Sequence, residues 1–512
     1  MTLPFRAEVL VVGAGLAGLS AATRLAAAGR DVHLVDAADH VGGRLTTTRV
    51  DGFTVDRGFQ VLNTGYPRVA DLDLAALDMG WFWTGAVVQG DTGPRRVVDP
   101  RQHPGTLLDT VRAPIGGLPR KAALAAFSAR AGYLPVSRLL AAPERTAAEA
   151  LRAAGVGEQA LESFLRPFLS GVLLEDRLTT SSRYLDLVWR SFVRGRVGLP
   201  AAGMQAVGQQ LADRLPPGHL HLGVRIIAVD GRSVRTATGT TTADAVVVAT
   251  DPDTAGRLLP GLGASAPRQV TTHLHVLPAS PWPAPLIVLG RPDGRLVNTV
   301  VVSDAQPAYS PDRRALVASS TLQPTREADL RAEIARAHGV TTGELDHLTS
   351  VTVTGAQPAA TPPLQHRRQV DLGGGLFVCG DHRDTPSIQG AMASGARTAR
   401  AVLRRLTAGG RAPVRGAAAD GRDRRALRST PGRFGPCPPP RPRSWRPAWG
   451  STPAVVARTT PHPGRSSTWP WSWRADPTGR GSPTWARRPA TTRRAWRPST
   501  ARSPAAPSGR RT

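Results

Sequence analysis

The chain has 512 residues, with 65 Lys and Arg against 38 Asp and Glu, and a formal net charge of +27. Because one ordinary core takes roughly 100–200 residues, this length predicts more than one domain. Only two cysteines are present, Cys379 and Cys437, which excludes a disulfide framework and a cysteine-ligated zinc site. No metal site is predicted.

The longest apolar stretch, residues 9–29, is interrupted by Gly13, Gly15, Gly18 and Arg24. A bilayer span needs about 20 mostly apolar residues, so this stretch does not predict one. The N-terminus also lacks the layout of a signal peptide, and a cytoplasmic protein is therefore expected.

Most of the positive charge lies in residues 411–512, which hold 22 of the 65 basic residues and 3 of the 38 acidic ones. The same segment has 18 of the 46 prolines and 7 of the 11 tryptophans, but few aliphatic residues. We therefore predict a disordered tail. The segment is limited to amino acids with GC-rich codons, which favours a frameshift product over a nucleic-acid-binding segment. The alternative rests on Arg interleaved with Trp, a pattern able to stack on single-stranded bases. No specific nucleic acid partner is expected.

The first elements in chain order form one βαβ unit, with strands over Glu8–Val12 and Asp31–Asp36 and a helix over Leu16–Ala28. Residues 105–214 are predicted to be mainly helical. Later strands are predicted at Val224–Val229, Ser233–Thr238, Ala245–Ala249, Thr271–Val276, Leu286–Leu289, Val297–Val302, Ala315–Ser320 and Leu376–Cys379, with helices near Glu327–Ala337 and Ile388–Leu406.

A glycine-rich turn, Gly13-Ala14-Gly15-Leu16-Ala17-Gly18, joins the first strand to the first helix. Gly13 permits the tight turn, Gly15 lets a pyrophosphate approach the backbone, and Gly18 allows close packing of helix and strand. Asp36 ends the second strand, where an acidic residue accepts hydrogen bonds from ribose hydroxyls. This context predicts dinucleotide binding.

Two further segments follow, Gly42-Gly43-Arg44 and Gly52-Phe53-Thr54-Val55-Asp56-Arg57-Gly58-Phe59. Together with the glycine-rich turn they resemble the flavin-containing amine oxidase superfamily, which includes protoporphyrinogen oxidases and phytoene-type desaturases. The resemblance implies that FAD is the cofactor and that Gly42, Gly43 and Arg44 lie against its pyrophosphate. Gly58 is assigned to the cofactor site on the same grounds.

The C-terminal part of the resemblance lies in Leu376–Asp381 and Pro386–Gly395, which look like the second flavin motif of the superfamily. It implies that Gly380 and Asp381 lie at the ribityl chain or pyrophosphate. The amides of Ile388 and Gln389 would face the pyrimidine edge of the flavin, where a helix N-terminus stabilises negative charge. The backbone of Val224 is the implied adenine contact.

Two departures from the amine oxidases concern Ser387 and Lys121. Many amine oxidases have a Tyr or Trp where Ser387 stands, as half of an aromatic cage, and many hold a water near the flavin with a lysine, whereas Lys121 is the only lysine of this chain. Both departures favour carbon–carbon dehydrogenation of a bulky apolar substrate. Phe59, Tyr66 or Tyr309 could still rebuild a cage.

The predicted fold is α/β, with a Rossmann-like FAD-binding domain and an inserted substrate domain of mixed sheet and helices. The FAD-binding domain is assigned to residues 1–65, 200–262 and 370–410. The substrate domain is assigned to residues 66–199 and 263–369, and the disordered tail to residues 411–512.

The predicted reaction is removal of a hydride by FAD from a bulky, hydrophobic small-molecule substrate, with oxygen or a quinone as electron acceptor. No catalytic base can be named from the sequence. Two alternatives stay open: an amine oxidase that uses oxygen, and an FAD-binding protein whose basic tail binds nucleic acid. Peripheral membrane contact is also left open.

Overall fold

The computed structural model describes residues 3–90, 93–99, 101–113, 115–263 and 266–409, all within the unit Met1–Ala418. The tail predicted over residues 411–512 lies outside these ranges.

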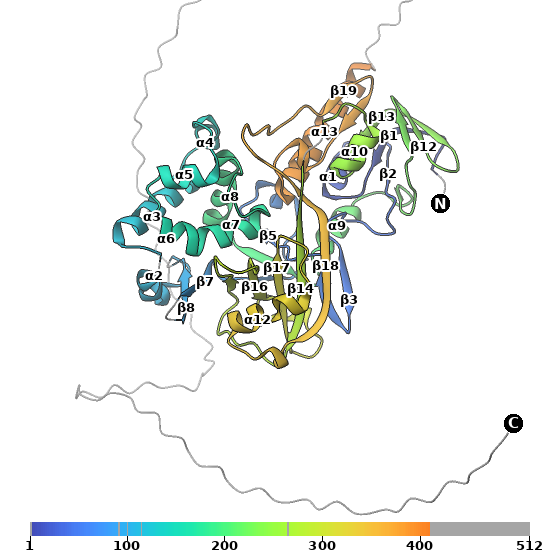
Figure 1. The fold of residues 1–512 in the computed structure, drawn as a ribbon. Coiled ribbons are helices and arrows are strands. Elements are labelled where there is room, and N and C mark those ends of the chain that lie inside the picture. Colours follow the sequence, from blue (N-terminus) through green and yellow to red (C-terminus); the bar gives the residue numbers. More distant parts are fainter. Residues whose placement is uncertain (1–2, 91–92, 100, 114, 264–265, 410–512) are drawn as a thin grey trace, which may run out of the picture. The chain divides into compact units, whose positions relative to one another are not determined.

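An eight-stranded sheet draws its strands from the N-terminal, middle and C-terminal parts of this unit (Figure 1). The strands are β1 (Arg6–Val12), β2 (Val32–Val35), β10 (Leu220–His221), β11 (Ala228–Asp230), β12 (Ser233–Arg235), β13 (Thr240–Val248), β19 (Asp371–Gly373) and β20 (Leu376–Val378). Their order is β10-β2-β1-β13-β12-β11, with β20 beside β13 and β19 beside β20. Strands β10, β2, β1, β13 and β20 run parallel, and both faces of β1 are buried. This burial explains the unbroken apolar run Val9–Val12.

Four helices accompany this sheet: α1 (Leu16–Ala27), α9 (Gln205–Ala212), α10 (Pro252–Leu258) and α13 (Ile388–Gly409). Helices α1 and α13 pack closely, since a Cβ added to Gly395 would lie 2.2 Å from the carbonyl oxygen of Ala17. The Ser20 hydroxyl donates to the carbonyl of Met392 at 2.9 Å in the same contact. The two glycine-rich motifs at opposite ends of the sequence are thereby held side by side.

The predicted βαβ unit is confirmed by β1, α1 and β2, but the strand predicted over Val224–Val229 is wrong for its first four residues. Strand β11 begins only at Ala228. Val224 donates its amide to the carbonyl of Asp36 at 2.8 Å, and Ile227 donates to Arg235 at 2.9 Å. These single bonds point to two different strands, so no regular ladder forms before Ala228.

A second sheet has seven strands in the order β18-β14-β17-β16-β15-β7-β8. The strands are β7 (Gly85–Gly90), β8 (Gly93–Val98), β14 (Pro267–Leu277), β15 (Ile287–Leu289), β16 (Asn298–Val301), β17 (Ala315–Thr321) and β18 (Asp346–Pro358). Only the β15–β7 pair is parallel among the pairs of this sheet. Along β17, Val317 packs with α12 (Glu327–His338), whereas Leu316 and Ala318 join the core of the first sheet. Alternate residues of one strand therefore serve two cores.

A helical layer packs around its own core, which includes Phe127, Leu165 and Leu185. Its elements are α2 (Leu107–Arg112), α3 (Leu118–Tyr133), α4 (Val136–Ala141), α5 (Ala147–Ala153), α6 (Glu158–Ala160), the π-helical turn η3 (Leu161–Leu165), α7 (Arg166–Leu173) and α8 (Ser182–Arg194). The described helices include none that is both long and apolar enough to cross a membrane.

Shorter elements complete the described chain. Strands β3 (Thr47–Val50) and β4 (Phe53–Asp56) form a hairpin, and β5 (Leu62–Asn63), β9 (Val197–Pro200) and β6 (Met79–Trp81) form a three-stranded sheet. The remaining helical elements are η1 (Pro67–Asp71), η2 (Pro104–Thr106), α11 (Val302–Ala305), η4 (Pro307–Tyr309), η5 (Thr342–Glu344) and η6 (Asp381–Arg383).

His338, at the end of α12, is buried under the second sheet and makes the fold sensitive to acid. Trp282 Nε1 donates to His338 Nδ1 at 2.9 Å, so the ring proton lies on Nε2, which is 2.8 Å from the Thr299 hydroxyl. Burial lowers the pKa of His338 to about 4. Below the unfolded-state pKa of about 6.5, the unfolded chain takes up a proton that the folded chain refuses.

We therefore expect the free energy of unfolding to fall as the pH drops from 6.5 towards 4, by up to about 3 kcal/mol from this residue. Urea denaturation across this range should show a flatter profile for His338→Gln than for the wild type. His347→Gln, which changes an exposed histidine, is the control. An equally steep profile in His338→Gln would contradict the assignment.

Candidate cofactor-binding and active site

The turn between β1 and α1 presents unpaired amides. Gly13, with φ +113°, donates to the carbonyl of Val35 at 2.7 Å and starts the turn. Among the described residues, no acceptor pairs with the amides of Gly15 and Ala17, and the first turn of α1 has no acidic side chain. The helix N-terminus thus offers an anion several donors and the positive end of its dipole.

The Gly42–Gly43 turn faces this helix end. Gly42 donates its amide to the carbonyl of Ala14 at 2.9 Å, and a Cβ on Gly43 would lie 3.0 Å from the Cα of Gly15. A Cβ on Gly15 would meet only the Cα of Gly43, at 3.9 Å. By contrast, a Cβ on Gly18 would lie 1.9 Å from the carbonyl oxygen of Gly13. Gly18 is therefore needed for packing, while Gly15 keeps space open.

Asp36 lies beside the same turn, at the end of β2. Its two carboxylate oxygens accept from the amide of Ala14 at 2.6 Å and from the amide of Ala38 at 2.8 Å. Because Val224 donates to the carbonyl of Asp36, the structure places the predicted adenine and ribose contacts next to each other. Each carboxylate oxygen retains a lone pair for a further donor.

Arg44 connects the N-terminal motif to the C-terminal one. Its guanidinium donates to Asp381 Oδ1 at 2.6 Å and to the carbonyl of Ala356 at 2.9 Å. Burial acts to lower the pKa of Arg44, but the Asp381 carboxylate more than offsets this and raises that pKa. Gly380, with φ +154°, precedes Asp381 and donates its amide to the Ser394 hydroxyl at 3.1 Å. The sequence suggested no pairing of Arg44 with Asp381.

The start of α13 is held from three sides. Tyr184 and Gln357 both donate to the carbonyl of Pro386, each at 2.6 Å. The Ser387 hydroxyl accepts from the amide of Gly390 at 3.0 Å, and the Gln389 side chain accepts from the amide of Arg68 at 2.8 Å. In the described chain the amides of Ile388 and Gln389 have no partner. A second helix N-terminus is thus free to accept negative charge.

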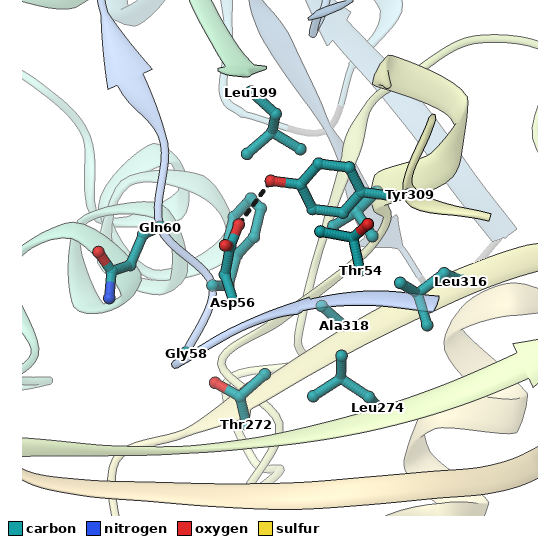
Figure 2. Close-up of a pocket in the computed structure, with 12 residues that line it drawn as sticks. Thr54, Asp56, Gly58, Gln60, Leu199, Thr272, Leu274, Tyr309, Leu316 and Ala318 are labelled. Carbon is teal, nitrogen blue, oxygen red and sulfur yellow. Dashed lines mark hydrogen bonds between the residues drawn. The ribbon is translucent and has the colours of Figure 1, made fainter. Parts of the chain in front are cut away.

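A small cavity of about 20 Å³, large enough for one water, lies between the end of β4 and the second sheet (Figure 2). Gly58, Gln60 and Thr272 contribute to its lining, and Asp56 lies beside it facing Tyr309. Asp56 accepts from the Tyr309 hydroxyl at 2.6 Å and from the amide of Met204 at 2.9 Å. It also accepts from the Thr47 hydroxyl. Burial raises the pKa of Asp56, although these three hydrogen bonds act to lower it.

A larger cavity of about 940 Å³ lies between η1 and the helical layer. Much of its lining is apolar, with Tyr66, Val69, Leu72, Leu74 and Val136. Its charged lining groups are Asp73, Arg190 and Arg194. The Asp73 carboxylate accepts from the amides of Ala75 and Ala76. The volume is at the upper end of the range for small-molecule pockets, roughly 300–1,000 Å³.

The aromatic residues proposed for a rebuilt cage are divided between the two cavities. Phe59 and Tyr309 line the small cavity, whereas Tyr66 lines the large one. Lys121 lies on α3 in the helical layer and lines neither cavity. Neither of these two cavities is lined by all three rings.

The unpaired groups form a coherent set for FAD. The α1 amides and the side-chain-free surface of Gly15 suit a diphosphate, Asp36 suits ribose hydroxyls, and the α13 amides suit an electron-rich ring edge. The sequence assigned no site role to Asp56 or Tyr184, and it named Tyr309 only as a possible cage residue. The bonds from Met204 and Tyr309 to Asp56 and from Tyr184 to Pro386 each span 148 or more residues, so local sequence does not reveal them.

A family model described as flavin containing amine oxidoreductase matches residues 16–403. The chain is 54% identical over 55 residues to 4,4'-diapolycopene oxygenase of Methylomonas sp, a match that spans 11% of each chain. An oxidoreductase from Methanosarcina mazei superimposes with a TM-score of 0.62 at 16% identity, over 77% of this chain and 99% of that one. Cyclohexylamine oxidase from Brevibacterium oxydans gives 0.60 at 17% identity, over 78% and 99%. With its family match over most of the sequence and its shared fold, the chain belongs to the flavin-containing amine oxidoreductase family.

Proposed function

We propose that this FAD-dependent oxidoreductase removes a hydride from a bulky, largely apolar substrate, in the manner of a polyene desaturase or a protoporphyrinogen-oxidase-like dehydrogenase. The observation that carries the proposal is the 940 Å³ cavity, which combines an apolar lining with two arginines and one already hydrogen-bonded carboxylate. An ammonium group would meet repulsion from Arg190 and Arg194 and would find no aromatic cage. A long apolar molecule would bury its surface there.

The chain's own residues would bind FAD and orient its ring. Bound FAD supplies the hydride acceptor. The amides of Gly15 and Ala17 would hold the diphosphate, with Gly42, Gly43 and Arg44 beside it and Gly58 near the ring. The Arg44–Asp381 pair would fix the two motifs at one separation, and the amides of Ile388 and Gln389 would face the ring edge where negative charge develops.

The large cavity is linked to the start of α13 by one hydrogen bond. The amide of Arg68, in η1, donates to the Gln389 side chain at 2.8 Å, and the neighbouring residues Pro67 and Val69 line the cavity. A substrate in this cavity would therefore contact η1, which is hydrogen-bonded to the start of α13, where the flavin edge is proposed to lie. This proximity supports the cavity as the substrate site.

The test is anaerobic mixing of the FAD-loaded protein with a panel of polyenes, tetrapyrroles and primary amines, followed by the absorbance of oxidised flavin. Bleaching by a polyene or a tetrapyrrole, with slow or no bleaching by amines, is the expected result. Reoxidation with oxygen and with a quinone then identifies the acceptor. Rapid bleaching by amines with fast recovery in oxygen would establish the amine oxidase alternative instead.

Filling the large cavity should slow this reaction without loss of FAD. Val136 lines the cavity and is 38% exposed, so Val136→Trp has room to fold while narrowing the opening. We expect flavin reduction by the best substrate to slow on the order of tenfold or more because the substrate is displaced from its position. Leu372→Trp, at an equally exposed site on β19, is the matched control. Equal rates in the two variants would argue against this cavity.

A further inference from the structure

Three histidines and an aspartate gather at the edge of the eight-stranded sheet, outside the cofactor and substrate sites described above. Strands β2 and β10 pair in parallel there, with Leu220 beside Leu34 and His221 beside Val35. The rings of His33 and His219 stack with centroids 4.7 Å apart, and His221 lies 5.2 Å from His33 by the same measure. Asp31 precedes β2 and has a half-exposed side chain.

Hydrogen bonds fix how two of these rings present their nitrogens. His219 Nδ1 lies 3.0 Å from the carbonyl oxygen of Val32. A carbonyl only accepts, so Nδ1 carries the proton and a neutral His219 keeps a lone pair on Nε2. His33 Nδ1 lies 2.9 Å from His221 Nε2, so His33 is oriented by His221. This is how metal-ligating histidines are positioned in proteins.

The remaining distances place the Asp31 carboxylate beside both stacked rings. Asp31 Oδ1 lies 3.5 Å from His33 Nε2 and 3.7 Å from His219 Nδ1. One ligand atom from each of the three residues falls within 4.8 Å of the others, a cluster with no counterpart elsewhere in the described ranges. Ligand atoms of a tetrahedral zinc site are about 3.3 Å apart. Metal binding would therefore require the parallel rings of His33 and His219 to tilt towards each other and His219 to present Nε2 to the ion.

We propose that Asp31, His33 and His219 bind a divalent transition-metal ion such as Zn²⁺, with His221 as the positioning residue for His33. Two imidazoles, one carboxylate and a water make a donor set typical of zinc.

The ion would join the two edge strands next to the nucleotide end of the sheet. The carbonyl of His221 accepts a hydrogen bond from the amide of Asp36 at 2.9 Å. A metal held by His33 and His219 would therefore stiffen the pairing of β2 with β10, which positions Asp36. Metal binding is therefore expected to raise the melting temperature of the FAD-loaded protein.

The experiment is calorimetric titration of the full-length, FAD-loaded protein with zinc sulfate at pH 7.5, after removal of metals by a chelator and without a histidine tag. We expect one site, and a loss of affinity of at least roughly a hundredfold in Asp31→Asn, His33→Gln and His219→Gln. His221→Gln should weaken binding by roughly ten- to a hundredfold, the effect of removing an orienting partner. His347→Gln, an exposed histidine of β18, should bind as the wild type does.

Zinc affinity that is unchanged in all three ligand variants would overturn the proposal, since the ion would then bind elsewhere, for example at Cys437 or His462 of the tail. The absence of stoichiometric binding by the wild type would overturn it equally. FAD absorbance of each variant serves to show that it is folded. A zinc-induced rise in melting temperature that disappears in His33→Gln and His219→Gln would support the site independently of the calorimetry.

Discussion

Replacing Gly15 by valine is expected to yield a folded protein that lacks FAD. Gly15 has φ −73°, which valine adopts, and a Cβ there would meet only the Cα of Gly43, at 3.9 Å. The new side chain would instead fill the space in front of the α1 amides and keep a diphosphate away. We expect a loss of about 3 kcal/mol or more in FAD binding, roughly a hundredfold or more in Kd.

The measurement is the ratio of flavin to protein after purification, together with a thermal melt of the apoprotein. Gly18→Ala is the informative comparison, because its Cβ would lie 1.9 Å from the carbonyl oxygen of Gly13 and the backbone would have to shift. That variant should lose folding stability, by about 1–3 kcal/mol or more. Full FAD content in Gly15→Val would disprove the assignment of this turn.

Replacing Asp56 by alanine is expected to cost the fold on the order of 3–5 kcal/mol. The change leaves three buried donors without their acceptor, namely the Thr47 hydroxyl, the Tyr309 hydroxyl and the amide of Met204. These donors come from β3, η4 and the start of α9, so one carboxylate joins three parts of the chain. Denaturant unfolding of the FAD-loaded protein measures the cost.

Asp230→Ala, at an exposed aspartate of β11, should change stability by less than about 0.5 kcal/mol. Tyr309→Phe removes one bond to Asp56 and should fall between the two variants, at about 1–2 kcal/mol. If Asp56→Ala were no more harmful than Asp230→Ala, this carboxylate would have no role in joining these segments.

Much of the cofactor-binding architecture could be predicted because its signals are local. The buried run Val9–Val12, the helix that follows and the acid Asp36 fall within 30 residues, and each has a short-range physical cause. The domain boundaries and the contact of each predicted residue with FAD stay predictions.

The rest of the site depends on contacts between distant residues. The Arg44–Asp381 pair spans 337 residues and the Tyr184–Pro386 bond spans 202, so no periodicity or spacing reveals them. Strand β18 also escaped prediction, because many of its side chains are polar or exposed and its pairing depends on β14. The segment at Val224 was assigned to a strand on its composition, but its hydrogen bonds go to different partners.

The most direct test of the account is the electron density of crystals grown from the flavin-loaded protein. We expect the FAD diphosphate within hydrogen-bonding distance of the Gly15 and Ala17 amides, the adenosine ribose at Asp36, and the flavin edge at the amides of Ile388 and Gln389. A diphosphate bound away from the N-terminus of α1, or a flavin ring remote from the start of α13, would contradict it.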